Sequence, residues 1–186
     1  MRRYFYFDVD GVLVDSRATV RASYEEALGQ RIDDVIWQEV WGKPWREWLV
    51  KHVGEIGEAV GVHRRKNDVY RELIRGGHAT PLAGADAVRR LYGADHGVRL
   101  ITGASETAAH AVLHWLNIPI QLLDVTEASR SDKVTRLAYL ESHGGVIHTD
   151  DDEKLITELE ERRVPAVHFH GQSINELMDE LWTRSS

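Results

Sequence analysis

Two carboxylates near the amino terminus have residue types and a spacing suited to chemistry. Residues 5–15 read FYFDVDGVLVD, so Asp8 and Asp10 follow an apolar run and are separated by one residue. Side chains alternate along a strand, which predicts that both carboxylates point the same way where the strand ends. Like charges this close favour protonation of one group unless a cation neutralises them, and Mg²⁺ prefers carboxylate oxygens. Gly11 allows a sharp turn beside them. A strand that ends in a solvated acidic turn is the alternative interpretation.

Strand-like apolar runs recur along the chain with helix-like segments between them. The predicted strands cover residues 3–9, 98–102, 120–123, 145–149 and 166–170, and the predicted helices among them cover 106–116, 133–142, 153–163 and 174–182. This alternation predicts an α/β fold with a Rossmann-like three-layer core, in which helices cover both faces of a parallel sheet. Ligands of such sheets bind beyond the carboxyl ends of the strands.

One long segment interrupts the alternation. Residues 16–79 contain no convincing strand, and their apolar residues recur at helical spacing between glycine breaks, which predicts about four helices. We therefore expect residues 1–15 and 80–186 to form the α/β core, and residues 16–79 to form a small all-helical domain inserted into it. Pro81 marks the return of the chain to the core.

Composition narrows the classes of function. The 186 residues carry a net charge of −7, which argues against binding to long nucleic acids. A small anionic substrate remains compatible, because a bound cation reverses the field locally. The chain has no cysteine, which excludes thiolate chemistry and fits the cytoplasm. The apolar run before Asp8 is too short for a signal peptide, and no membrane span is expected. A monomer or a homodimer is expected.

The ends of the predicted strands bring further reactive groups together. Thr102 ends the second strand and is followed by Gly103 and Ser105, while three aspartates at 150–152 follow the fourth strand. Lys133 begins the helix before that strand. In a parallel sheet all of these groups gather at one edge with the first carboxylate pair. Carboxylates, a hydroxyl, backbone N–H groups and one ammonium suit a phosphoryl group, whose transfer depends on positioning and charge stabilisation.

With these motifs in this order, the chain resembles the haloacid dehalogenase superfamily, specifically its phosphatase-like members with a helical cap after the first strand. The matching segments are DVDGVLVDS, Thr102 in LITGAS, Lys133, and Asp150 with Asp151 in VIHTDDD. PLAGADAVRRL resembles the usual return from the cap. Two positions depart from the family pattern, since Val134 follows the lysine where proline is frequent and Thr149 stands where glycine is frequent.

The resemblance implies a role for each motif residue. Asp8 would be the nucleophile that forms an aspartyl-phosphate, and Asp10 would protonate the leaving oxygen and then activate water. An acid at position 10 points to phosphate esters as substrates. Thr102 and the Gly103 N–H would bind phosphate oxygens, and Lys133 would pair with both Asp8 and phosphate. The ligands of Mg²⁺ would be Asp8, the Asp10 carbonyl, Asp150 and Asp151. Asp152 is a third acidic candidate, or the N-cap of the helix at 153–163.

Four tryptophans distinguish the helical insertion, at Trp37, Trp41, Trp45 and Trp48. Their spacing places each pair on one face of a helix, so packing between helices is the first interpretation. The alternative is that Trp41 or Trp45 stacks on a nucleobase of the substrate. Arg17, just past the first motif, is a further candidate for substrate contact. His148 is expected only to line a face of the sheet.

Together these observations predict a Mg²⁺-dependent phosphomonoester hydrolase for a small phosphorylated metabolite. A nucleoside monophosphate is the first substrate class because of the tryptophans, and a sugar phosphate or phosphoglycolate is the second. A phosphomutase with the same Asp8 chemistry and a catalytically idle binding protein are the alternatives.

Overall fold

The computed structural model describes residues 3–41 and 43–185. The chain divides into two compact units, Met1–Asp15 with Thr80–Ser186 and, inserted between them, Ser16–Ala79. The first unit contains a five-stranded sheet in the order β5-β4-β1-β6-β7. Its strands are β1 (Tyr4–Phe7), β4 (Gly97–Ile101), β5 (Leu123–Val125), β6 (Val146–Asp150) and β7 (Ala166–His168). All neighbouring pairs are parallel, which confirms the predicted α/β fold class.

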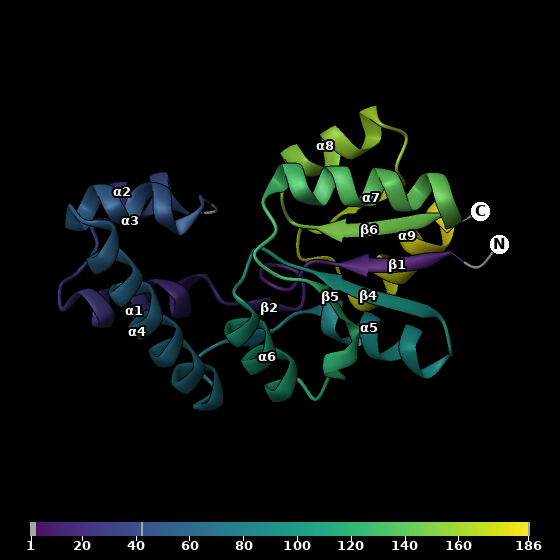
Figure 1. Ribbon diagram of the computed structural model, residues 1–186. Coiled ribbons are helices and arrows are strands. Elements are labelled where there is room, and N and C mark those ends of the chain that lie inside the picture. The colour runs from purple at the N-terminus through teal and green to yellow at the C-terminus, as the bar shows by residue number, and fades with distance from the viewer. Residues whose placement is uncertain (1–2, 42, 186) are drawn as a thin grey trace. The chain divides into compact units, whose positions relative to one another are not determined.

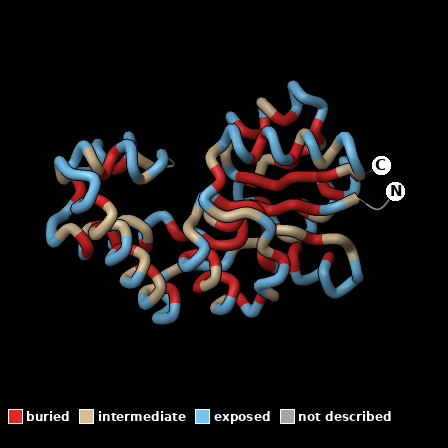
Figure 2. Tube along the Cα trace, viewed as in Figure 1, coloured by how far each residue is buried: buried red, intermediate tan, exposed pale blue. Residues whose placement is uncertain are grey.

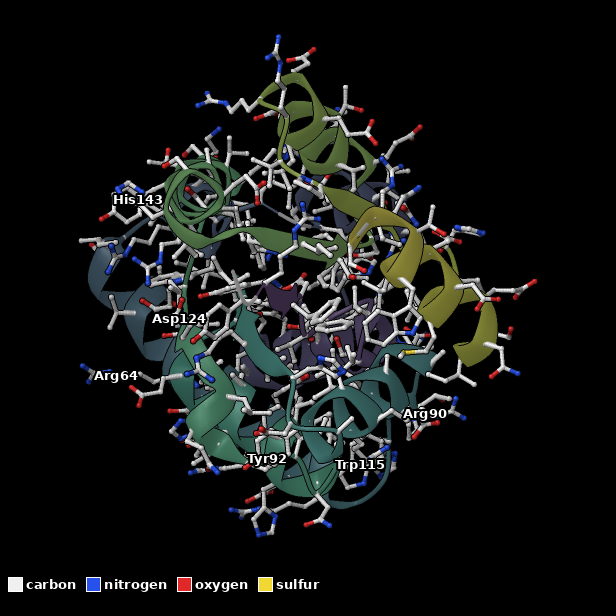
Figure 3. All side chains as sticks on the ribbon, turned by 90° about the vertical axis from the view of Figure 1, so that its right-hand side faces the viewer. Arg64, Arg90, Tyr92, Trp115, Asp124 and His143 are labelled. Carbon is white, nitrogen blue, oxygen red and sulfur yellow. The ribbon has the colours of Figure 1, made fainter. Side chains whose placement is uncertain are left out.

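Helices cover both faces of this sheet (Figure 1). They are α5 (Ala83–Gly93), α6 (Glu106–Trp115), α7 (Arg130–Gly144), α8 (Glu153–Glu161) and α9 (Ile174–Ser185). Helices α7 and α8 lie on one face, and α5 and α9 lie on the other. The polar side of these helices faces solvent, where the side chains of Arg90, Tyr92 and His143 project outward (Figure 3).

Successive side chains of β1 and β6 point to opposite faces of the sheet, and this alternation decides which side chains face which helices. Phe5 points to one face, where its ring meets the Trp182 ring of α9 edge-on at 5.6 Å. Tyr6 and Val146 point to the other face and join the core beneath α7 and α8 with Val134. Both strands are buried along most of their length (Figure 2). Even-numbered positions at the ends of β1 and β6 therefore face α7.

Strand β4 ends at Ile101 rather than at Thr102, and other strands also differ from the prediction. The strand predicted at 120–123 is wrong for its first part, because Ile120–Leu122 forms a 3₁₀ helix after Pro119 and β5 follows it. Strand β1 ends at Phe7 rather than at residue 9, because the chain turns directly after Asp8. Two short strands that were not predicted, β2 (Val14–Asp15) and β3 (Thr80–Pro81), pair antiparallel at the two ends of the insertion.

The second unit contains four helices within its described residues: α1 (Arg17–Leu28), α2 (Asp34–Val40), α3 (Trp45–Val53) and α4 (Ile56–Arg75). Its core gathers the apolar faces of all four around Tyr24, Trp37, Trp48 and Leu49. Left-handed glycines at 29 and 54 end α1 and α3. Among the described residues of the whole chain, no helix is both long and apolar enough to cross a membrane.

Candidate active site

Asp8 and Asp150 lie side by side at the carboxyl edge of the sheet. Strands β1 and β6 are paired with Phe7 opposite Thr149. The backbone N–H of Asp8 continues this ladder by donating to the Thr149 carbonyl at 2.9 Å. The two carboxylates therefore follow equivalent positions of neighbouring strands, on the face that α7 covers. Both residues are buried, with 7% of Asp8 and 1% of Asp150 exposed.

Lys133 places its ammonium between these two carboxylates. Its Nζ lies 3.1 Å from Asp8 Oδ2 and 2.8 Å from Asp150 Oδ2. Lys133 stands in the first turn of α7, which a capping box of Ser129 and Asp132 starts at a defined residue. Although burial alone would lower it, the charges of Asp8 and Asp150 raise the pKa of Lys133. Lys133 is therefore charged and binds both acids.

The turn after Asp8 brings Asp151 against the backbone. The Val9 carbonyl accepts from the N–H groups of Leu13 and Val14, which closes the turn. Gly11 has a φ of +83°, and a Cβ at this position would collide with the Asp151 carboxylate. Glycine is needed here for both reasons, because other residues rarely adopt this φ and none leaves room for the carboxylate. The turn therefore packs directly on the acidic segment after β6.

Three carboxylates form a group that fits a divalent cation. Asp8, Asp150 and Asp151 each offer one oxygen, and these oxygens lie within 4.8 Å of one another. Asp8 Oδ1 is buried and has no hydrogen-bond partner among the described residues. A buried carboxylate oxygen without a partner is costly, and a hard cation such as Mg²⁺ would satisfy it. The Asp10 side chain is not a member of this group, and metal binding by its carbonyl stays a prediction.

Electrostatics at this edge leave an excess of negative charge. Burial raises the pKa of the Asp8 carboxyl well above its usual range, and neighbouring carboxylates add to this against the opposing effect of Lys133. Burial also raises the pKa of Asp151, to about 6, with a contribution from the charge of Asp150. Burial opposes ionisation of Asp150 too, but Lys133 and His148 hold its pKa below the usual range. A cation bound here would lower the pKa of Asp8 and Asp151.

The residues predicted to bind phosphate lie at the end of β4, the other neighbour of β1. Thr102 is buried, and its hydroxyl accepts from the Ala104 N–H at 3.0 Å. Ser105 caps α6 by accepting from the Ala108 N–H at 3.3 Å. Gly103 lies between them, where a Cβ would approach the backbone of residue 128 at 3.3 Å. These groups share the carboxyl edge with Asp8, and phosphate binding by them stays a prediction.

Two residues near Asp150 have roles that the structure defines. Asp152 is the N-cap of α8, because its Oδ1 accepts from the N–H groups of Lys154 and Leu155, which confirms the capping alternative. His148 does more than line the sheet, as its Nε2 lies 3.0 Å from Asp150 Oδ2. This contact was not predicted, although the spacing of two residues along β6 could have indicated it.

The predicted substrate contacts of the helical unit have partners within that unit. Trp37 and Trp48 are buried in its core, as the packing interpretation predicted. The Trp45 ring stacks on the His63 ring at 4.2 Å, with 8° between the planes. The Arg17 guanidinium lies 5.3 Å from the centre of the Trp41 ring. Contact of Arg17, Trp41 or Trp45 with a substrate stays a prediction.

Comparison with known proteins identifies the fold. No protein-family profile matches this sequence, and no curated protein matches it. Among solved structures, CbbY from Rhodobacter sphaeroides in complex with phosphate has a TM-score of 0.73 and 20% identity, over 92% of this chain and 88% of that one. β-Phosphoglucomutase from Clostridium difficile has a TM-score of 0.70 and 16% identity, over 99% and 97% of the two chains.

A putative phosphoglycolate phosphatase from Lactobacillus plantarum has a TM-score of 0.69 and 11% identity. The match covers 97% of this chain and 100% of that one. Further matching structures are described as haloacid dehalogenase-like hydrolases. At these identities the likeness concerns the fold. In this chain Asp8, Lys133 and Asp150 meet at the carboxyl edge of the parallel sheet. The chain therefore has the fold of the haloacid dehalogenase superfamily.

Proposed function

We propose that this protein is a Mg²⁺-dependent phosphomonoester hydrolase that acts on a small phosphorylated metabolite through an aspartyl-phosphate. The observation that carries the proposal is the buried Lys133 between Asp8 and Asp150, with Asp8 Oδ1 left without a partner among the described residues. The lysine holds one oxygen of Asp8, and the other has no hydrogen bond that would compete with a cation or with phosphorus. The fold shared with CbbY, with a putative phosphoglycolate phosphatase and with a β-phosphoglucomutase supports the same proposal.

In this proposal Asp8 attacks phosphorus. A bond forms from its carboxylate oxygen to phosphorus as the bond from phosphorus to the leaving oxygen breaks, and Asp10 gives its proton to that oxygen. Asp10 then takes a proton from the water that attacks phosphorus, which releases phosphate and restores Asp8. Lys133 orients Asp8 and stabilises charge on the phosphoryl oxygens, while Thr102 and the Gly103 N–H donate to those oxygens.

Asp8, Asp150 and Asp151, with the carbonyl of Asp10, would hold Mg²⁺. When bound, the ion supplies positive charge that offsets repulsion between the Asp8 carboxylate and a dianionic phosphate. Burial and the neighbouring carboxylates raise the pKa of Asp8, and the positive charge of the ion would lower it again.

A phosphorylated sugar or short acid fits as substrate at least as well as a nucleotide. CbbY has been solved with xylulose-(1,5)bisphosphate, and the other two relatives are named for phosphoglucose and phosphoglycolate. Stacking on a nucleobase would need a free aromatic face. The Trp45 ring already contacts His63 and lies 5.2 Å from the Arg46 guanidinium. We therefore place sugar phosphates and phosphoglycolate ahead of nucleoside monophosphates.

The experiment measures inorganic phosphate released from a panel of sugar phosphates, phosphoglycolate and nucleoside monophosphates, with Mg²⁺ and with EDTA. Asp8→Asn is expected to abolish release without unfolding the protein. Asp152→Asn is the matched control in the same acidic triplet, and it is expected to keep the activity because asparagine caps helices equally well. Phosphate release by Asp8→Asn, or release in EDTA, would refute the proposal. Conversion of a sugar phosphate without release of phosphate would favour the phosphomutase alternative, for which β-phosphoglucomutase is the structural precedent.

The cytoplasmic location, and a monomeric or dimeric state, stay predictions from the sequence.

A further inference from the structure

His148 is a buried polar side chain that the proposed reaction steps do not use. Its side chain is 0% exposed, and it lies in the middle of β6. Position 148 precedes Asp150 by two residues, so alternation along the strand directs both side chains to the face that α7 covers. Val146, two residues earlier, fills the same face with an apolar side chain. A polar ring at such a place is costly to bury unless it makes a hydrogen bond.

The hydrogen bond that His148 makes is to the site itself. Three donors hold the Asp150 carboxylate: Lys133 Nζ at 2.8 Å and His148 Nε2 at 3.0 Å contact Oδ2, and the backbone N–H of Asp152 contacts Oδ1 at 3.0 Å. Lys133 also reaches Asp8 Oδ2 at 3.1 Å. The orientation of the Asp150 carboxylate therefore decides where the ammonium lies against Asp8.

We propose that His148 is a positioning residue, whose Nε2–H fixes the Asp150 carboxylate for binding the cation and for holding Lys133. This inference deepens the proposed function and rests on it. The geometry supports this role, because His148 Nε2 lies 3.0 Å from Asp150 Oδ2. The other ring nitrogen, Nδ1, is buried and has no hydrogen-bond partner among the described residues. Loss of a hydrogen bond behind a ligating group typically weakens metal affinity or activity by about 10–100-fold.

Three substitutions separate this role from simple packing. His148→Leu fills the space but removes the donor, whereas His148→Gln replaces the ring with an amide whose N–H reaches about as far. Thr149→Val is the matched control on the same strand, because the Thr149 hydroxyl is buried and has no hydrogen-bond partner among the described residues. Should His148→Leu not fold, His148→Met removes the donor with a more adaptable side chain.

The measurement is the affinity of the full chain for Mn²⁺ and Mg²⁺ by calorimetry, in the absence of substrate, with thermal denaturation as the check of folding. We expect His148→Leu to weaken cation binding about 10–100-fold, with kcat falling more than KM changes. His148→Gln should recover most of the affinity, and Thr149→Val should match the wild type. Wild-type cation affinity in folded His148→Leu would overturn the proposal, and so would an equal loss in His148→Leu and His148→Gln. If the wild type binds the cation but releases no phosphate from any substrate, the proposed function is refuted. The comparison of cation affinities among the variants still decides the role of His148 in that case.

Discussion

Replacement of Lys133 by methionine tests whether the positive charge of this lysine stabilises the buried carboxylates of Asp8 and Asp150. The methionine keeps an unbranched side chain of similar length but removes the ammonium from between Asp8 and Asp150. At separations of 3.1 and 2.8 Å, each attraction is worth about 5–6 kcal/mol at an effective dielectric constant of about 20. Desolvation of the lysine offsets much of this. Loss of one partner from a buried ion pair typically costs about 3–5 kcal/mol, because the remaining charges stay buried without compensation.

The assay is urea denaturation of the metal-free protein at pH 8, followed by circular dichroism. We expect Lys133→Met to lower the free energy of unfolding by about 3–5 kcal/mol, which for a chain of this length corresponds to a fall in Tm of about 6–20 °C. Arg136→Met is the matched control on the same helix. The side chain of Arg136 is 43% exposed and lies 3.3 Å from Asp124 on the edge strand, so its loss should cost under about 1 kcal/mol.

The pH dependence gives the sign of the effect. Without the lysine, the pKa of Asp8 in the folded protein should rise further above its value in the unfolded chain. The raised pKa lowers the free energy of unfolding at any pH above the folded-state pKa of Asp8. This loss of stability disappears as the pH falls toward about 4, where aspartates of the unfolded chain also bind protons. The difference between Lys133→Met and wild type should therefore shrink from pH 8 to pH 5. A Lys133→Met protein as stable as wild type at pH 8, or a difference that grows at low pH, would refute the reasoning.

Two further expectations concern the cation and the core. Burial and the charge of Asp150 raise the pKa of Asp151 to about 6, so below that pH Mg²⁺ must compete with a proton. Calorimetry should therefore show weaker Mg²⁺ binding at about pH 5 than at about pH 7.5. Equal affinity at both pH values would contradict the assignment of Asp151 as a ligand. Gly84→Ala would place a methyl group 2.7 Å from Val12 Cγ1 and against the Val12 backbone, and should cost about 1–3 kcal/mol in urea denaturation. Gly93→Ala on the same helix meets nothing within 4 Å and should be neutral or slightly stabilising, so a similar loss in both variants would count against close packing at Gly84.

The order of motifs along the sequence was enough to predict the fold class and the groups that gather at the sheet edge. Asp8, Lys133 and Asp150 are far apart in sequence, yet the rule that parallel strands end at one edge predicts their proximity. The structure adds the distances and the directions. It also separates Asp152 from the group, because only the backbone geometry of the residue before α8 could decide between a cap and a ligand.

Other features depend on tertiary contacts that a single sequence does not contain. The apolar run at 120–123 is compatible with a strand, but Pro119 fixes the backbone so that Ile120–Leu122 turns as a 3₁₀ helix. The tryptophan spacing predicted shared helical faces without saying what covers them. The structure places Trp48 edge-on to the Tyr24 ring at 4.8 Å, and Trp45 against His63. Which face of a ring is free depends on helices distant in sequence.

The charge pattern at the edge distinguishes this site from an ordinary buried ion pair. In a balanced pair, loss of either partner is destabilising, because the other is left uncompensated. Here one lysine faces Asp8 and Asp150, and Asp151 lies beside them, while His148 contributes a hydrogen bond to Asp150. The metal-free fold therefore carries a surplus of negative charge that packing alone does not require. Such a surplus is expected where a protein must bind a cation, and it explains why loss of the lysine should weaken the fold while a divalent ion should strengthen it.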